Sequence, residues 1–100
     1  MSMRETYEAK LQAQLDEWAA DINILKAKAD KAKVDVQQEY NKQIEHLQLM
    51  HVSATAKLAE FKEASEEAWH DLKAGVESAW ELLENALKSA ASRFNNTKED

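Results

Sequence analysis

Apolar side chains recur every three or four residues along almost the whole chain, from Tyr7 to Phe94. The average step is about 3.6 residues, which keeps these side chains on one face of a nearly straight α-helix with little supercoiling. The strict alternation of apolar and polar residues that is typical of a β-strand does not occur along this stripe. The pattern therefore predicts long amphipathic helices and no sheet.

The composition supports the same fold class. The chain has no proline and one glycine, Gly75, and it is rich in the Ala, Glu, Lys, Leu and Gln residues that favour helices. One glycine inside a helix costs about 1 kcal/mol relative to alanine, so Gly75 does not by itself end a helix. We predict an all-α protein, built either as a helical hairpin or as one continuous rod. A three-helix bundle, the alternative at this length, needs two tight turns for which we find no clear sequence signal.

We expect one elongated helical domain over residues 1–94, with two candidate helix breaks. At 64–66, Ser65 is suited to cap a new helix whose first turn is acidic. At 51–55, β-branched and hydroxyl residues gather without a strong helix breaker. Residues 95–100 are polar and begin with two asparagines, so we predict a frayed tail there.

Folding the chain back on itself about residue 49 brings complementary parts together. Trp18 then lies opposite Trp80, and the basic cluster at 26–33 lies opposite the acidic residues in 65–72. A hairpin and an antiparallel dimer of straight helices share these pairings. Neighbouring registers also fit because the stripe is periodic, so the pattern favours this antiparallel register without requiring it.

The apolar stripe predicts self-association. Burying one large apolar side chain is worth roughly 1.5–3 kcal/mol, and the chain carries 3 Trp, 2 Tyr and 2 Phe besides its leucines. The stripe must therefore meet another helix, from the same chain or from a second copy. We predict a coiled-coil-like homo-oligomer, a dimer or larger. Its seam consists of Leu11, Leu15, Trp18, Ile22, Leu25, Val36, Ile44, Leu47, Leu58, Phe61, Trp69, Leu72, Val76, Trp80, Leu83, Leu87 and Phe94.

The charge restricts the partners. The formal net charge is −6, from 13 basic and 19 acidic residues. Nucleic acid needs a basic footprint and anionic lipid attracts basic segments, so we expect no nucleic-acid partner and regard a membrane surface as disfavoured. The chain lacks cysteine, a signal-peptide pattern and an apolar run of membrane-spanning length, and we expect a cytoplasmic protein.

Three residues in the middle of the chain are the best candidates for metal binding. His46 and Met50 are four residues apart and share a helix face, with His51 next to them. Imidazole and thioether ligands suit copper, so a weak copper-binding bundle is one hypothesis. A gap-filling Met and a helix-surface His explain the same residues without a metal. We therefore predict no cofactor and keep copper as the third functional hypothesis.

We find no catalytic constellation. Paired acids such as Glu66 and Glu67 need a desolvated pocket before they act as general acids, and an exposed helix face provides none. The Glu67-to-His70 spacing occurs in di-iron bundles, but those need a second such motif and two further glutamates. The sequence indicates a non-enzymatic structural or interaction protein, a coiled-coil accessory whose acidic surface serves solubility or a basic protein partner.

The segment 65–94 is the most strongly amphipathic part of the chain, with Trp, Leu and Phe on one face. Such a helix can pack in an oligomer seam, or it can lie in the headgroup region of a lipid surface. Lipid binding favours lysine and arginine on the polar face, whereas this polar face is acidic. A reversible lipid-surface binder is therefore the second functional hypothesis.

Several stretches are similar to a known family. They are Leu-Asp-Glu-Trp at 15–18, the Lys/Ala-rich run at 26–33, Ala-Trp-His-Asp-Leu-Lys-Ala-Gly-Val-Glu-Ser-Ala-Trp at 68–80, and Ser-Ala-Ala-Ser-Arg-Phe at 89–94. Together they resemble a family of short bacterial coiled-coil proteins, mostly uncharacterised and sometimes labelled general-stress or apolipoprotein-like. The resemblance implies a cytosolic, non-enzymatic, stress-associated protein and supplies no catalytic residues.

Overall fold

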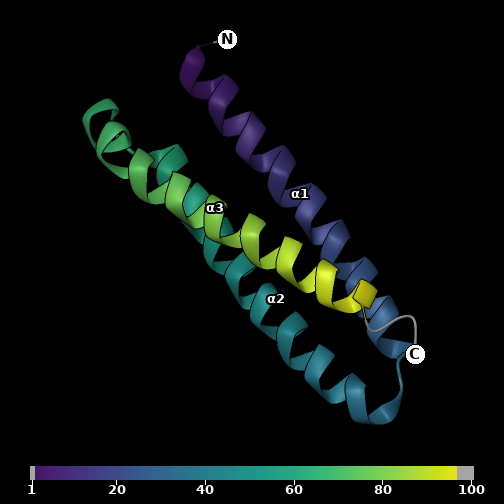
Figure 1. The fold of residues 1–100 in the computed structure, drawn as a ribbon. Helices are drawn as coiled ribbons and strands as arrows, with labels where there is room; N and C mark the ends of the chain where they lie inside the picture. Colours follow the sequence, from purple (N-terminus) through teal and green to yellow (C-terminus); the bar gives the residue numbers. More distant parts are fainter. Residues whose placement is uncertain (1, 97–100) are drawn as a thin grey trace.

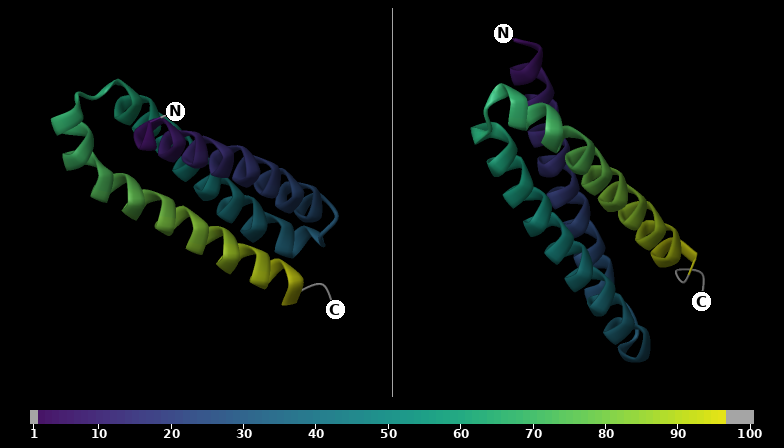
Figure 2. Two further views of the ribbon diagram at one scale, coloured as in Figure 1. Left: turned by 90° about the horizontal axis from the view of Figure 1, so that it is seen from above. Right: turned by 90° about the vertical axis from the view of Figure 1, so that its left-hand side faces the viewer.

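The computed structural model describes residues 2–96, which form three long helices joined by two short turns (Figure 1). α1 spans Met3–Asp30, α2 spans Val34–Glu63 and α3 spans Glu66–Asn96. α2 runs antiparallel to both other helices, and α1 and α3 run in the same direction (Figure 1, Figure 2). The elongated bundle has principal extents of 52 × 21 × 16 Å. The prediction of an all-α fold is confirmed, in the form of a three-helix bundle.

The predicted helical hairpin and continuous rod are both wrong, because the chain turns twice. The first turn lies at residues 31–33 and contains neither glycine nor proline. A side chain from the next helix caps the end of α1 instead: Gln37 Nε2 donates to the carbonyls of Ala29 at 3.2 Å and Asp30 at 3.3 Å. The carbonyl of Ala29 also accepts the backbone N–H of Ala32 at 3.1 Å, so backbone and side-chain donors together satisfy the end of α1 without a glycine.

The second turn is made by Ala64 and Ser65. Ala64 is extended, with φ −71° and ψ 150°, and ends α2. Ser65 begins α3, because its Oγ accepts a hydrogen bond of 3.2 Å from the backbone N–H of Ala68. Residues 51–55, the other candidate break, lie inside an uninterrupted α2. α3 continues to Asn96, and the rest of the expected tail lies outside the described residues.

The apolar stripe forms the core of this single chain. Phe61, Leu15, Leu47 and Leu83 are the largest side chains that are fully buried. Of the residues assigned to an intermolecular seam, those buried inside the bundle are Leu11, Leu15, Trp18, Ile22, Leu25, Ile44, Leu47, Leu58, Phe61, Trp69, Val76, Trp80, Leu83, Leu87 and Phe94. Val36 and Leu72 are partly buried against the same core. The stripe is thus covered by the chain's own helices and does not require a second copy.

The pairing of Trp18 with Trp80 occurs, but in a different geometry from the predicted one. Their ring centroids are 6.4 Å apart, and they lie on the parallel helices α1 and α3. Tyr7 and Trp69 pair at the same sequence offset, with centroids 5.8 Å apart. The fold about residue 49 is therefore wrong. The basic cluster at 26–33 lies near the first turn, at the opposite end of the bundle from the start of α3 (Figure 1).

Within residues 2–96, no helix has the combined length and apolar character that crossing a membrane requires.

Candidate interaction surfaces

The residues proposed for copper binding point to different neighbours. His51 Nε2 lies 2.8 Å from the backbone carbonyl oxygen of Leu15 on α1, so this nitrogen carries a proton and donates. His46 lines a groove on the other side of α2, facing Arg93 of α3. Met50 is partly buried against the core. Among the described residues, no group of three or more His, Cys, Asp or Glu side chains is arranged to hold a metal ion.

The helix proposed for lipid binding has its apolar face inside the bundle. Trp69, Trp80 and Phe94 of α3 retain 6%, 5% and 4% of their exposure. A lipid surface would have to replace α1 and α2 on this face, which requires α3 to separate from them.

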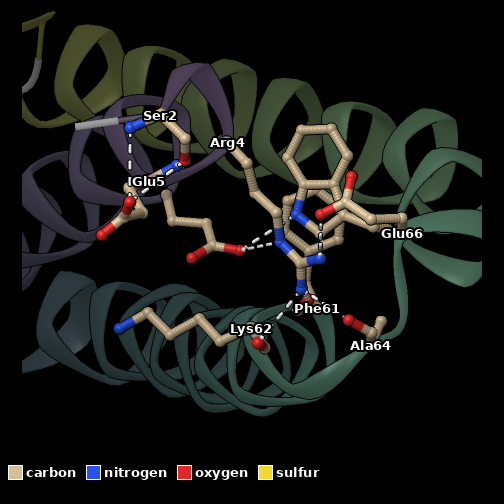
Figure 3. Close-up of polar contacts among 9 residues, drawn as sticks. Ser2, Arg4, Glu5, Phe61, Lys62, Ala64 and Glu66 are labelled. Carbon is tan, nitrogen blue, oxygen red and sulfur yellow. Dashed lines mark hydrogen bonds and ion pairs between the residues drawn. The ribbon is translucent and has the colours of Figure 1, made fainter.

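The densest polar cluster surrounds Arg4, at the start of α1. Its guanidinium donates to the carbonyl oxygens of Phe61 at 3.3 Å, Lys62 at 3.2 Å and Ala64 at 2.6 Å, at the end of α2 (Figure 3). It also forms ion pairs of 3.1 Å with Glu8 of α1 and Glu66 of α3. One side chain thus connects all three helices and adds a donor for the carbonyls at the end of α2, of which Phe61 also accepts the backbone N–H of Ala64 at 3.3 Å.

Aromatic side chains lie directly beneath this cluster. Trp69 stacks on Phe61 with centroids 4.6 Å apart, and its Nε1 donates a 2.9 Å hydrogen bond to Oε2 of Glu8. Arg4 lies over the Trp69 ring, 5.5 Å from its centroid, and Lys73 lies 5.2 Å from the centroid of Tyr7. These contacts bury the rings and give each polar tip a partner, so the cluster holds the bundle together.

Two pKa values respond to this arrangement. Burial raises the pKa of the Tyr7 phenol above its ordinary value, and the charge and hydrogen bond of Glu77 raise it further. Desolvation works against the charged Arg4 guanidinium, but hydrogen bonds and charge from Glu8 and Glu66 outweigh it, so the pKa of Arg4 is raised. Both side chains therefore keep their protons over the physiological range.

An open groove of about 340 Å³ lies between α2 and α3, toward the first turn. Lys42, Gln43, His46 and Leu47 line it from α2, and Ala86, Ser89, Ala90 and Arg93 line it from α3. Its lining thus joins an apolar floor to basic side chains on both helices. We call it the α2–α3 groove.

The outward face of α2 carries a second surface. Lys42, Glu45, Leu49, Val52, Ala56, Ala59 and Glu63 are all exposed and follow one another in alternating steps of three and four residues. Leu49 and Val52 each keep 65% of their exposure, which is high for large aliphatic side chains. Alternating steps of three and four are the spacing of a two-helix seam. We call this set the outer α2 seam.

These surfaces have weaker signals in the sequence than the main apolar stripe has. Leu49 and Val52 were available as a second, weaker stripe on α2, opposite the first. Arg4 carried no such signal, because its partners at the end of α2 and the start of α3 are about 60 residues away in the chain. The groove likewise depends on Arg93 meeting Lys42 and His46 through the antiparallel packing of α2 and α3.

Comparisons with known proteins add no further constraint. No protein-family model matches the chain, and neither the curated proteins nor the solved structures that were searched contain a match. The resemblance to short bacterial coiled-coil proteins accordingly stays an expectation.

Proposed function

We propose that this protein is a non-enzymatic accessory protein that acts as an antiparallel pair of bundles, joined along the outer α2 seam. The observation that carries the proposal is the exposure of Leu49 and Val52 in the middle of a seam with two-helix spacing. Single exposed aliphatic residues are common on protein surfaces, but Leu49 and Val52 lie together on one helix face with the spacing of a seam.

The seam is suited to a second copy in the opposite direction. An antiparallel partner places Leu49 of each chain beside Val52 of the other, with the small Ala56 and Ala59 allowing close approach. Lys42 lies at one end of the seam and Glu63 at the other, and among the described residues neither forms an ion pair within its own chain. In the register that sets Leu49 beside Val52, Lys42 of one chain lies opposite Ala59 of the other, one helical turn from Glu63, so the two long side chains are within reach of each other, twice by symmetry.

The contact is small, so the pair is expected to be weak and reversible. One helix face from each chain buries less area than a permanent dimer requires. We expect a dissociation constant between about 10 µM and 1 mM. Such a weak dimer suits an accessory role, because the fraction of paired copies then changes with the concentration of the protein. A stress-related role rests on the family resemblance alone, and no residue of the described chain adds to it.

Sedimentation velocity across a concentration series tests this proposal. The wild-type chain should show a monomer–dimer equilibrium, and Leu49→Glu combined with Val52→Glu should abolish it. Ile24→Glu is the matched control, because Ile24 is also an exposed aliphatic residue, 55% exposed, but lies on α1. A wild-type chain that stays monomeric to about 1 mM rejects the proposal.

A charge exchange tests the direction of the pair. Lys42→Glu alone should weaken the dimer, and adding Glu63→Lys should restore it, because both symmetric contacts are then reversed together. If the double variant is as weak as the single one, the antiparallel arrangement is wrong.

A further inference from the structure

The first turn is made of residues that also suit a helix. Lys31 still has the right-handed helical conformation, with φ −94° and ψ −4°, and Lys33 is extended, with φ −63° and ψ 148°. The φ of Lys33 is already that of an α-helix, so a rotation about its ψ moves this residue into one. Residues 31–37 contain no glycine or proline, and within residues 2–96 no non-glycine residue has a positive φ. No residue type in this turn prevents α1 from continuing into α2.

The hydrogen bonds of the first turn have substitutes in a continuous helix. Gln37 now donates its side-chain amide to the carbonyls of Ala29 and Asp30. In a continuous helix these carbonyls accept the backbone N–H groups of Lys33 and Val34, four residues further on. The side chain of Lys33, the N-cap of α2, makes no capping hydrogen bond. Joining the two helices therefore replaces one side-chain cap by ordinary helical hydrogen bonds.

The apolar stripe also continues through the first turn. Ala29 and Tyr40 are buried, and Ala32 and Val36 between them pack partly against the same core. The steps between these four residues are three or four positions, so a continuous helix keeps them on one face. Opening the turn leaves the same side chains facing the core.

The second turn is held by contacts that include α1 itself. Ser65 caps α3 through its Oγ. Arg4 of α1 donates to the carbonyl of Ala64 at 2.6 Å and forms an ion pair of 3.1 Å with Glu66 (Figure 3). If α1 leaves the bundle, these Arg4 contacts leave with it, and the α1 of a second copy supplies the same group again.

We propose that two copies of this chain exchange α1 by opening the first turn. In each copy α1 and α2 then form one helix over residues 3–63, and α1 packs against α2 and α3 of the other copy. The place that α1 vacates is complementary to α1, because it sets Trp18 against Trp80 and Tyr7 against Trp69, as in the single chain. The occupant is therefore a second copy, and exchange of identical elements is a low-cost route to dimers.

The exchange is distinct from pairing along the outer α2 seam. Seam partners are closed bundles that separate on dilution, whereas exchanged copies separate only after α1 leaves a buried core. Salt also acts in opposite directions. Exchange brings the lysine-rich segments 26–33 of both copies together where the opened turns cross, and salt screens their repulsion. The contact between Lys42 and Glu63 in the seam is an attraction, which salt weakens.

The distance between two spin labels within one chain tests the exchange. Lys10→Cys and Lys57→Cys carry the labels, since the chain has no cysteine of its own and both positions are exposed. Both positions lie about 20 residues from the first turn, so the closed bundle sets them at the same level on neighbouring antiparallel helices. One continuous helix separates them by about 70 Å, at 1.5 Å per residue.

The labelled chain carries Leu49→Glu and Val52→Glu, which remove seam pairing, and is mixed with a large excess of unlabelled chain, so that only distances within one chain are measured. The mixture is unfolded in guanidinium and refolded at about 1 mM and, in parallel, at about 10 µM. We expect a dimer after refolding at the higher concentration that persists on size-exclusion chromatography and has the long distance. Its fraction should rise with salt.

Proline at position 34 separates the open form from the closed one. Val34 is 84% exposed and is the first residue of α2, a position that accepts proline, and Lys33 already has the extended backbone that precedes one. Inside a continuous helix the same proline removes a hydrogen bond and clashes with the preceding turn. Val34→Pro should therefore lower the exchanged fraction by about tenfold or more. Val34→Ala, the matched control, should exchange as readily as the parent chain.

Several results overturn the proposal. They are a parent chain without the long distance after refolding at about 1 mM, a dimer whose labels stay close together, and equal exchanged fractions in Val34→Pro and Val34→Ala. Thermal melting followed by circular dichroism checks that Val34→Pro folds. Lys33→Gly combined with Val34→Gly covers the case in which it does not, because glycine fits the turn and weakens a helix. An exchanged fraction in that variant equal to that of the parent chain also rejects the exchange.

Discussion

Arg4 Nη1 lies 3.1 Å from Oε1 of Glu66, which joins the first turn of α1 to the first residue of α3. The same guanidinium donates to three carbonyls around the end of α2. The three helices therefore meet at one side chain, at the end of the bundle where α2 turns into α3 (Figure 3).

Replacing Arg4 should loosen this end of the bundle first. Arg4→Ala removes the side-chain donor from the carbonyls of Phe61, Lys62 and Ala64 and breaks the ion pair with Glu66, so we expect a lower melting temperature and faster amide hydrogen exchange at residues 61–68. Arg4→Lys should be intermediate, because lysine keeps the charge but lacks the planar set of donors. Lys10→Ala, on the exposed face of α1, should change neither quantity. Unchanged exchange in Arg4→Ala contradicts the capping role.

Truncating a core tryptophan should lower the free energy of unfolding far more than truncating a surface residue. Trp80 is 5% exposed, packs against Trp18 and donates a 3.4 Å hydrogen bond to the carbonyl of Leu11. Trp80→Ala should lower the free energy of unfolding by about 3–5 kcal/mol in denaturant titration. The control is Leu82→Ala, two residues away and 62% exposed, which should cost well under half as much. Similar losses in both variants would show that Trp80 is not part of the core.

Alanine in place of Gly75 should stabilise the protein. Gly75 lies inside α3 without a positive φ, and a Cβ added there meets nothing within 4 Å. The substitution removes backbone freedom from the unfolded chain at no steric cost, so the free energy of unfolding should rise by roughly 0.5–1 kcal/mol. Gly75→Val tests the cause, because a β-branched residue has lower helix propensity and should gain less. A destabilised Gly75→Ala variant would mean that Gly75 has a contact of its own.

Because of the Tyr7 phenol, the free energy of unfolding should depend on pH in the alkaline range. The folded pKa of this phenol is raised above the ordinary value of 10.0, so the folded state holds this proton more tightly than the unfolded state. The resulting stabilisation is complete below pH 10 and is lost as the pH rises through the folded pKa. Ultraviolet titration of Tyr40→Phe, in which Tyr7 is the remaining tyrosine, should show tyrosinate forming above its ordinary range. Glu77→Gln should lower this pKa, and a Tyr7 with ordinary titration would contradict the contact.

Neutral and anionic vesicles should leave the protein in the supernatant. The apolar face of α3 is covered by α1 and α2, and the charge of the chain repels anionic lipid. The same vesicle sedimentation with Arg4→Ala, near the melting temperature of that variant, is the more sensitive test, because opening the bundle exposes Trp69. Binding of the intact wild-type chain to either vesicle would favour the lipid-surface hypothesis.

The fold class could be predicted from the sequence, and the number of helices could not. The spacing from Tyr7 to Phe94 identified the buried face of every helix, since that periodicity is a local property. The turn at 31–33 has no local signal, because its cap is the side chain of Gln37 in the next helix. A continuous periodic stripe across a turn of this kind has the same appearance as one long helix.

The pairing of helices was beyond the sequence for a related reason. A periodic stripe fits many registers. Trp18 lies opposite Trp80 in a hairpin or an antiparallel dimer of straight helices, and it also does so in the parallel packing of α1 and α3. What selects between them are single long-range contacts, such as Trp69 Nε1 with Glu8. The same applies to the α2–α3 groove, whose lining residues acquire a common site only after the helices pack.

The parallel packing of α1 and α3 has a consequence for the order of folding. α1 and α2, and likewise α2 and α3, are neighbours in the chain and are joined by a single short turn. The contacts of Tyr7 with Trp69 and of Trp18 with Trp80 instead join α1 to α3, so they form only after the whole of α2 is in place. Such long closures have the largest entropic cost and form late. All three tryptophans take part in them. Trp69 also stacks on Phe61 across the second turn, so the fluorescence of Trp18 and Trp80 reports the docking of the first helix on the last, and the formation of the individual helices must be followed by another signal.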